Sequence, residues 1–300
     1  MPTVHEPVLL DEVLAGLNPK SGENFIDCTF GGGGHSLALV EKVKPSGKVI
    51  GIDWDNNAVR QASHQNLIII NDNYRNLKSI YEKCQKDFQV GEISGVLLDL
   101  GLSSDQLADA DRGFSFLSTG DLDMRFDKDS DAQTASDIIL NYSEKELTHI
   151  FEEYGEEPLA KIIAQAIVKA RTNGDNIQSA AMLVRLIEDI YRRKFRQPSK
   201  KNPATRVLQA LRIVVNDEFG NIRAVLPKAI EILRPGGRLA VISFHSGEDR
   251  LIKNFFKEMS SGDYPRLRLI NKKPIIAGER ELQKNPRARS AKLRIAEKIK

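Results

Sequence analysis

The first hundred residues alternate between short apolar runs and segments whose apolar residues recur at helical spacing. The strand candidates are residues 24–30, 48–55, 67–72 and 95–101, and helical patterns follow the first two at residues 36–43 and 56–63. Continuous runs of Val, Ile and Leu are typical of parallel strands that are buried on both faces. The pattern therefore predicts βαβ units that form a parallel sheet.

This alternation stops near residue 105 and resumes about a hundred residues later. Residues 160–171 and 180–195 have apolar positions at helical spacing, and no strong strand pattern interrupts them. Later, a helical pattern at 222–233 precedes a buried strand at 238–246 and another helix at 247–259. We therefore predict an α/β domain built from residues 1–104 and 205–300, interrupted by an all-helical insertion at residues 105–204.

Composition places the chain among soluble globular proteins. Of its 300 residues, 41% are hydrophobic, which is enough for a sizeable core. No stretch reaches the roughly 18 apolar residues of a membrane span, and the first residues do not resemble a signal peptide, so we expect a cytoplasmic protein. Cys28 and Cys84 lack the spacing of a metal site or a disulfide framework, and we expect both to be buried thiols.

Four glycines, Gly31 to Gly34, follow the first predicted strand. In doubly wound folds this turn brings bare backbone close to a ligand. The dinucleotide fingerprint G-x-G-x-x-G fails here, because its sixth position falls on Ser36 or Leu37. The loop favours a ligand without a pyrophosphate, of which S-adenosyl-L-methionine is the common one. A purely structural tight turn is the alternative.

Two aspartates end neighbouring strand candidates. Asp53 lies about twenty residues beyond the loop, where an acid accepts hydrogen bonds from ribose hydroxyls; a helix N-cap is the alternative. Asp99 ends the fourth strand candidate, where amino-methyltransferases place an acceptor that orients an exocyclic amine; a strand-end cap is the alternative. Methyl transfer from a sulfonium needs no metal, so we expect none.

A series of ordered motifs resembles the RsmH (MraW) family, bacterial methyltransferases that modify N4 of a cytosine in the decoding (P-site) region of 16S rRNA. The motifs are HEPVLLDEVL, DCTFGGGGH, GIDWD, LLDLGLSS, RGFSF, DLDMR, YGEE, PATRVLQALRIVVNDE, PGGRLAVISFHS and NPRARSAKLR, and they run from His5 to about Ile295. The resemblance implies a class I methyltransferase (Rossmann-like) core with a mixed sheet, and an inserted helical domain for substrate recognition.

The resemblance also implies site residues. Contacts with S-adenosylmethionine fall on Gly33, Gly34, His35, Asp53, Tyr74, Asp99 and Gln106, and the catalytic role falls on Asp99. Tyr74 stands where the family usually has phenylalanine, and either ring covers an adenine face. Gly247 stands where leucine is expected, so we expect a looser start to the last long helix. We expect a structural role for His245, whereas RGFSF is either core packing or a lid.

Charge indicates a polyanionic partner. The bases Arg192, Arg193, Lys194, Arg196, Lys200 and Lys201 cluster without an acid, and the tail at residues 284–300 adds more. A solvated charged face is the alternative. The resemblance implies 16S rRNA within the small ribosomal subunit as the partner, met by a monomer or a homodimer.

Two other functions stay open beside this rRNA (cytosine-N4)-methyltransferase. One is a DNA amino-methyltransferase, although such enzymes usually carry D-P-P-Y where this chain has DLGL. The other is a non-catalytic RNA-binding factor for ribosome assembly, which would have no need of Asp99 beside an intact glycine loop. Labelled methyl transfer to rRNA, DNA and small subunits separates the three.

Overall fold

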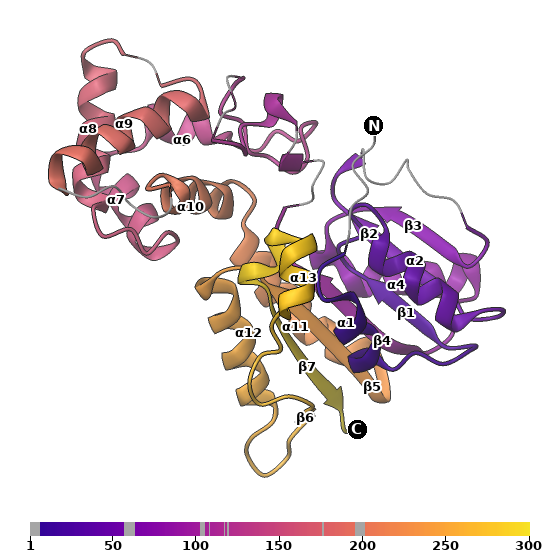
Figure 1. The fold of residues 1–300 in the computed structure, drawn as a ribbon. Helices are drawn as coiled ribbons and strands as arrows, with labels where there is room; N and C mark the ends of the chain where they lie inside the picture. Colours follow the sequence, from indigo (N-terminus) through magenta and orange to yellow (C-terminus); the bar gives the residue numbers. More distant parts are fainter. Residues whose placement is uncertain are drawn as a thin grey trace. The chain divides into compact units, whose positions relative to one another are not determined.

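The computed structural model describes residues 7–56, 64–102, 106–107, 109–116, 118, 120–175, 177–195 and 202–300. The chain forms two compact units (Figure 1). Residues 1–101 and 219–300 build the sheet unit, and residues 102–218 build the helical unit. We expected the sheet unit to resume at residue 205. It resumes at Phe219 instead, because the helix α10 (Thr205–Val215) packs against helices of the helical unit.

The sheet unit contains seven strands in the order β3-β2-β1-β4-β5-β7-β6. Their bounds are β1 Asn24–Asp27, β2 Val49–Asp53, β3 Leu67–Asn71, β4 Ile93–Asp99, β5 Leu233–Ser243, β6 Leu267–Leu269 and β7 Lys292–Lys298. Strands β1 to β5 pair in parallel, and β7 pairs antiparallel with both β5 and β6. This mixed sheet is the class I methyltransferase (Rossmann-like) arrangement, which confirms the predicted α/β fold.

Helices cover both faces of this sheet. They are α1 Leu10–Leu17, α2 Gly34–Val43, α4 Leu77–Phe88, α11 Glu218–Ile232, α12 Ser246–Met259 and α13 Glu279–Lys284, with short 3-10 turns at Tyr74–Asn76 and Pro286–Ser290. Side chains of α1 and α2 join one face in a common apolar cluster that includes Phe25, Leu97 and Ile242. Because strand residues alternate between faces, the buried Val96 and Leu98 belong to the opposite layer.

Strands β6 and β7 were not predicted, because charged residues hide the β7 pattern. Arg294 lies within β7 and is only 8% exposed, and its Nε donates to Asp249 Oδ1 at 2.7 Å. Lys298 donates its Nζ to the carbonyl oxygen of Glu231 at 3.1 Å. Part of the basic tail is therefore neutralised inside the sheet unit and is unavailable to a polyanion.

The helical unit is built on its own apolar core. Its elements are a 3-10 turn at Ala110–Arg112, α6 Ala135–Asn141, α7 Glu144–Glu153, α8 Ala160–Thr172, α9 Ala180–Lys194 and α10. Thr134 and Ser143 begin α6 and α7 with complete capping boxes, in which the cap side chain and an acid three residues later satisfy each other's backbone amides. Leu147, Phe151 and Ile163 are fully buried between these helices.

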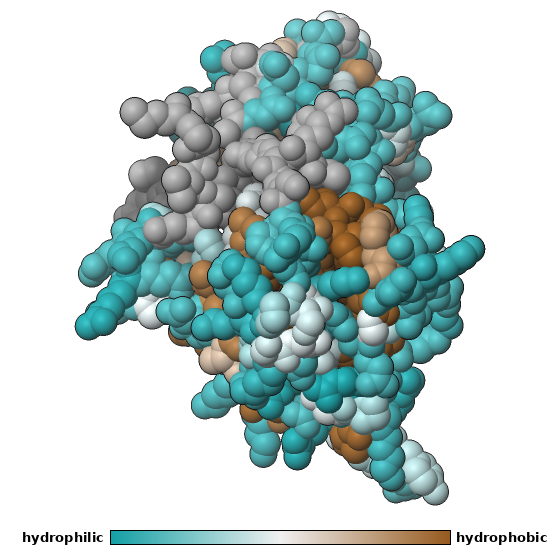
Figure 2. Space-filling model, turned by 90° about the vertical axis from the view of Figure 1, so that its right-hand side faces the viewer, coloured by the Kyte–Doolittle hydropathy of each residue, from teal (hydrophilic) through white to brown (hydrophobic). Residues whose placement is uncertain are grey.

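Strand β3 lies at one edge of the sheet, and four of its five side chains are only partly buried. On the side of the molecule shown in Figure 2, an apolar area is exposed among hydrophilic residues.

The helix predicted at residues 56–63 lies, beyond Asn56, outside the described residues. Cys28 and Cys84 are buried and unpaired, as predicted. Among the described residues, no helix is long and apolar enough to cross a membrane.

Candidate active site at the carboxyl edge of the sheet

Three aspartates end three neighbouring parallel strands. Asp27 ends β1, Asp53 ends β2 and Asp99 ends β4, and β1 lies between the other two. The carboxyl ends of parallel strands meet at one edge of the sheet, where ligands of open α/β folds bind. We call this edge, with its three aspartates and the glycine loop, the carboxyl edge.

The glycine loop is fixed to β2 by Asp53. Asp53 Oδ2 accepts a hydrogen bond from the amide of Gly31 at 2.7 Å, and its Oδ1 accepts one from the amide of Asp55 at 2.8 Å. Gly33 has a φ of 76°, which favours glycine, and a Cβ there would lie 2.8 Å from the Phe30 ring. Burial raises the pKa of Asp53 to about 6, although these two amides oppose the shift.

Asp27 is a site residue that sequence reasoning missed. It is 1% exposed, and Ser36 donates its hydroxyl to Asp27 Oδ2 at 2.7 Å. Asp27 Oδ1 accepts from the amide and hydroxyl of Thr29 at 3.1 and 3.3 Å. The Thr29 hydroxyl oxygen in turn accepts from the amide of Asp99 at 2.7 Å. Asp27 therefore ties α2, β1 and β4 together, and its strand-end position in DCTFGGGGH was the available signal.

Asp99 is partly buried beside a histidine. Its Oδ2 lies 3.6 Å from Nδ1 of His35, and its Oδ1 is buried without a hydrogen-bond partner among the described residues. Burial raises the pKa of the Asp99 carboxyl well above its usual range, and the negative charges of Asp27 and Glu248 raise it further. A buried acceptor oxygen without a donor is costly unless a ligand supplies one.

The other expected residues are placed as follows. His35 occupies the first turn of α2, and its Nε2 donates to the carbonyl oxygen of Val8 at 3.0 Å. Tyr74 begins the turn after β3 and is half-buried. Five of the expected residues lie together at the carboxyl edge: Gly33, Gly34, His35, Asp53 and Asp99. Tyr74 follows the end of the adjacent strand, and Gln106 is buried in the helical unit.

His245 caps α12. Its Nδ1 accepts from the amide of Glu248 at 3.4 Å, while Glu248 Oε2 accepts from the amides of Phe244 and His245 at 2.8 and 3.3 Å. This capping box is the structural role that we expected. The start of α12 is not loosened by Gly247, because a Cβ there would lie only 2.6 Å from Cζ of Phe219, whose ring fills that space.

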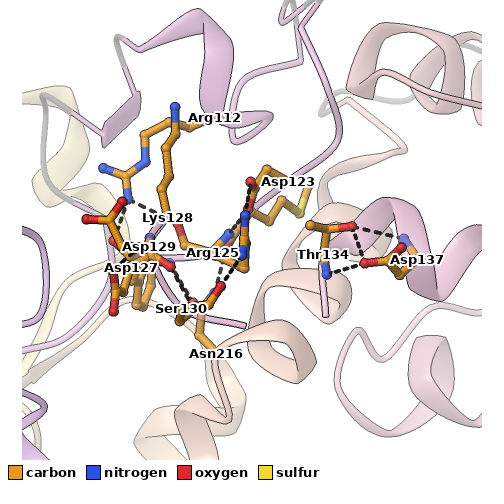
Figure 3. Close-up of polar contacts among 12 residues, drawn as sticks. Arg112, Asp123, Arg125, Asp127, Lys128, Asp129, Ser130, Thr134, Asp137 and Asn216 are labelled. Atoms are coloured by element: carbon orange, nitrogen blue, oxygen red, sulfur yellow. Dashed lines mark hydrogen bonds and ion pairs between the residues drawn. The ribbon is translucent and has the colours of Figure 1, made fainter. Parts of the chain in front are cut away.

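In the helical unit, the RGFSF and DLDMR motifs form one polar network (Figure 3). Arg112 is 3% exposed and donates to the carbonyls of Arg125 and Phe126 at 3.0 and 2.6 Å. Asn216 donates to the carbonyl of Met124 at 2.7 Å and accepts from the amide of Phe126 at 2.8 Å. Phe114 belongs to the apolar core of the unit, so the first half of RGFSF is core packing.

Comparison with known proteins identifies the family. The chain matches the MraW methylase family over residues 2–299. It is 45% identical over 314 residues to a ribosomal RNA small subunit methyltransferase H of Heliobacterium mobile, covering 98% of this chain and 99% of that one. It is 44% identical to the protein of that name from Thermomicrobium roseum, covering 99% and 94%. A solved putative methyltransferase of Streptococcus mutans in complex with SAH aligns at 14% identity and a TM-score of 0.43, covering 98% and 99%. This chain belongs to the MraW methylase family.

Proposed function

We propose that this protein transfers a methyl group from S-adenosyl-L-methionine to N4 of a cytosine in the decoding region of small-subunit 16S rRNA. The observation that carries the proposal is Asp99, a partly buried strand-end carboxylate whose Oδ1 is buried without a hydrogen-bond partner among the described residues. The names of the relatives support rRNA of the small subunit as the substrate class. Ribosomal subunits are cytoplasmic, so we propose the same location for this protein.

The carboxyl edge fits S-adenosylmethionine in two respects. First, the glycine loop follows β1 at the carboxyl edge, and Gly32 presents exposed backbone there. Second, none of the three aspartates forms an ion pair with a lysine or arginine among the described residues, so their charge suits a cationic sulfonium. Gly33, Gly34 and His35 would hold the cofactor with Asp53 at the ribose, and Tyr74 and Gln106 complete the set that the resemblance implies.

The chemistry of Asp99 follows from the weak nucleophilicity of the target amine. When bound, the cofactor supplies a methyl carbon that is electrophilic because it is attached to a positively charged sulfur. The N4 lone pair of cytosine is delocalised into the ring, and a hydrogen bond from the amino group to Asp99 Oδ1 restricts its rotation and orients it. Once N4 has taken the methyl carbon from sulfur, which is left as a neutral thioether, the amine would be positively charged, and the ionised Asp99 would accept its proton. The raised pKa of Asp99 makes this carboxylate a stronger base.

The target base must be presented outside a stack, because a donor at the edge of a sheet cannot reach a paired amino group. Exposed basic residues of the helical unit support contacts with rRNA phosphates. Arg193 and Lys194 are exposed in the last turn of α9, and Arg192, also exposed, lies 3.2 Å from Asp189. Arg196, Lys200 and Lys201 of the same basic cluster lie outside the described residues.

Methyl transfer from labelled S-adenosylmethionine tests the substrate. We expect label on small subunits or their rRNA and none on naked DNA, and nucleoside mass spectrometry should find N4-methylcytidine. Label on DNA alone would favour a DNA amino-methyltransferase. Absence of transfer to all three substrates, with cofactor binding retained, would favour an assembly factor.

Salt dependence tests the RNA contacts. Replacing Arg192, Arg193 and Lys194 with glutamine should flatten the slope of log affinity against log salt by about 0.7–0.9 for each phosphate that is no longer neutralised. Cofactor affinity should not change. A slope equal to that of the unsubstituted protein would make this cluster a solvated face.

A further inference from the structure

The backbone of residues 7–9, which we call the N-terminal segment, lies against the glycine loop. A Cβ at Gly34 would lie 3.1 Å from the ring of Pro7. The amide of Leu9 donates to Oε1 of Glu281 in α13 at 2.7 Å, although 272 positions separate the two residues. Leu9 is fully buried and has a φ of 54°, a left-handed conformation that is uncommon for leucine. The segment is thus held from both sides in a conformation that it would not prefer alone.

The N-terminal segment determines which nitrogen of His35 carries hydrogen. The carbonyl oxygen of Val8 can only accept, so His35 Nε2, at 3.0 Å, must be the donor. Nδ1 is then the nitrogen that faces Asp99 Oδ2 at 3.6 Å. Without a proton between them, a bare Nδ1 and an ionised carboxylate would repel each other. At this distance the contact is an ion pair rather than a hydrogen bond, and it favours one proton shared by the pair, carried either by Nδ1 or by the carboxyl.

We propose that His35 is a positioning residue that holds this proton beside Asp99. We also propose that Glu281 keeps His35 in this role, because it holds the amide of Leu9 and thereby the Val8 carbonyl that accepts from His35 Nε2. The proposal rests on the proposed function, because it assumes that Asp99 acts as an ionised acceptor. It assigns a task to α13, a helix that the resemblance does not connect with the reaction.

The charges around Asp99 explain why such a proton matters. Asp99 faces Asp27 from β1, Glu248 from α12 and His35 from α2, and the two acids favour its neutral form. When the shared proton is on His35, Asp99 is ionised and accepts the amine. The pair holds one proton in both arrangements, so exchange between them needs no proton from solvent. Methyl transfer should then vary little with pH near neutrality, whereas Asp99 without His35 would be protonated from solvent.

Single-turnover methyl transfer at several pH values tests this role. For His35→Gln we expect the rate to fall as the pH is lowered, by at most about tenfold per pH unit, and to approach that of the unsubstituted protein at alkaline pH. Glu281→Ala should shift the profile in the same direction by less. Glu281→Gln keeps an acceptor oxygen for Leu9 and should restore the profile, and Glu279→Ala, an exposed acid of the same helix, is the matched control. A uniform loss of rate with an unchanged profile would overturn the proposal.

Nitrogen NMR of the histidine rings provides a readout without cofactor or RNA. The full chain has five histidines, and His35→Gln assigns the His35 signals. We expect Nε2 of His35 to carry hydrogen, and Glu281→Ala to introduce a second ring state in a folded protein. A bare Nε2, or a Glu281→Ala spectrum identical to that of the unsubstituted protein, would overturn the proposal. If Asp99→Asn keeps its full rate, the proposed function fails instead, and the NMR result still decides the ring geometry.

Discussion

The two ends of the parallel strands differ in how their charged side chains are paired. At the carboxyl edge, the carboxylates of Asp27 and Asp53 accept hydrogen bonds from hydroxyl groups and backbone amides, and that of Asp99 lies 3.6 Å from His35. Among the described residues, no lysine or arginine pairs with any of the three. At the opposite edge, where β1, β4 and β5 begin, partly buried charges are paired with counter-charges. We call this second edge the amino edge.

Ion pairs fill the amino edge. Arg234 donates to Ser94 at 2.8 Å and also pairs with Glu23. Arg238 donates to the carbonyl of Gly16 at 2.7 Å and pairs with Glu297 at 3.2 Å. A cavity of about 240 Å³ lies here, lined by residues that include both arginines. The comparison teaches that the cavity lies at the edge whose charges are paired, whereas the edge where we propose the active site carries carboxylates that pair with no lysine or arginine among the described residues.

The largest expected effect concerns Asp99. Asp99→Asn keeps the shape but offers a weaker, neutral acceptor, so the methyl-transfer rate should fall by roughly 10²–10⁴. Single-turnover transfer to small subunits, with cofactor and substrate saturating, measures this step. A rate within about threefold of the unsubstituted protein would remove the functional difference between the two edges.

Asp53 should make stability depend on pH. Its pKa rises from 3.8 to about 6 on folding, so the folded state holds this proton more tightly than the unfolded state. The contribution of Asp53 is therefore most favourable at low pH and is lost as pH rises through about 6. Relative to Asp53→Asn, the protein should lose about 2–3 kcal/mol between about pH 4 and pH 7. Urea unfolding across this range measures the difference; a constant difference would mean that Asp53 is not desolvated.

The carboxyl edge should prefer a cation. Asp99→Asn removes a carboxylate that pairs with no lysine or arginine among the described residues, so it should weaken binding of S-adenosylmethionine relative to neutral S-adenosylhomocysteine by about 1 kcal/mol, or roughly fivefold. Calorimetry with the two ligands on the same preparation gives this ratio. An unchanged ratio of the two affinities would show that the charge of Asp99 does not contribute to binding of the sulfonium.

The smallest effect belongs to the amino edge. Arg238→Met breaks a partly exposed ion pair and a hydrogen bond to Gly16, and should cost about 1 kcal/mol of unfolding free energy. The methyl-transfer rate should stay within about twofold. A loss of rate comparable to that of Asp99→Asn would place the amino edge in the active site and overturn the comparison.

Local pattern was sufficient for the elements that lie in the middle of the sheet. Strands β1, β2 and β4 are runs of apolar residues because they are buried on both faces, and α8, α9 and α12 show one apolar stripe each. Strand β7 was missed because the buried Arg294 looks like a surface residue until Asp249 is placed beside it. The boundary of the helical unit was missed because α10 has the same periodicity in either unit, and only its packing decides.

The same distinction holds for the candidate site. Gly33, Asp53 and Asp99 could be predicted because strand ends and glycine turns are local features. The contacts of Val8 with His35 and of Leu9 with Glu281 involve backbone groups, which every residue has. No residue type announces such contacts, so only the folded chain reveals them.

The Phe219 ring beneath the start of α12 implies a compensating exchange between two positions. Gly247 and Phe219 share one volume, since a Cβ at residue 247 would lie 2.6 Å from the ring. A relative with leucine at this position should therefore carry a smaller side chain where this chain has Phe219. Gly247→Leu alone should overpack the site, and adding Phe219→Ala should recover part of the stability. These two positions would then change together during divergence, as a pair whose summed volume is kept rather than as two independent sites.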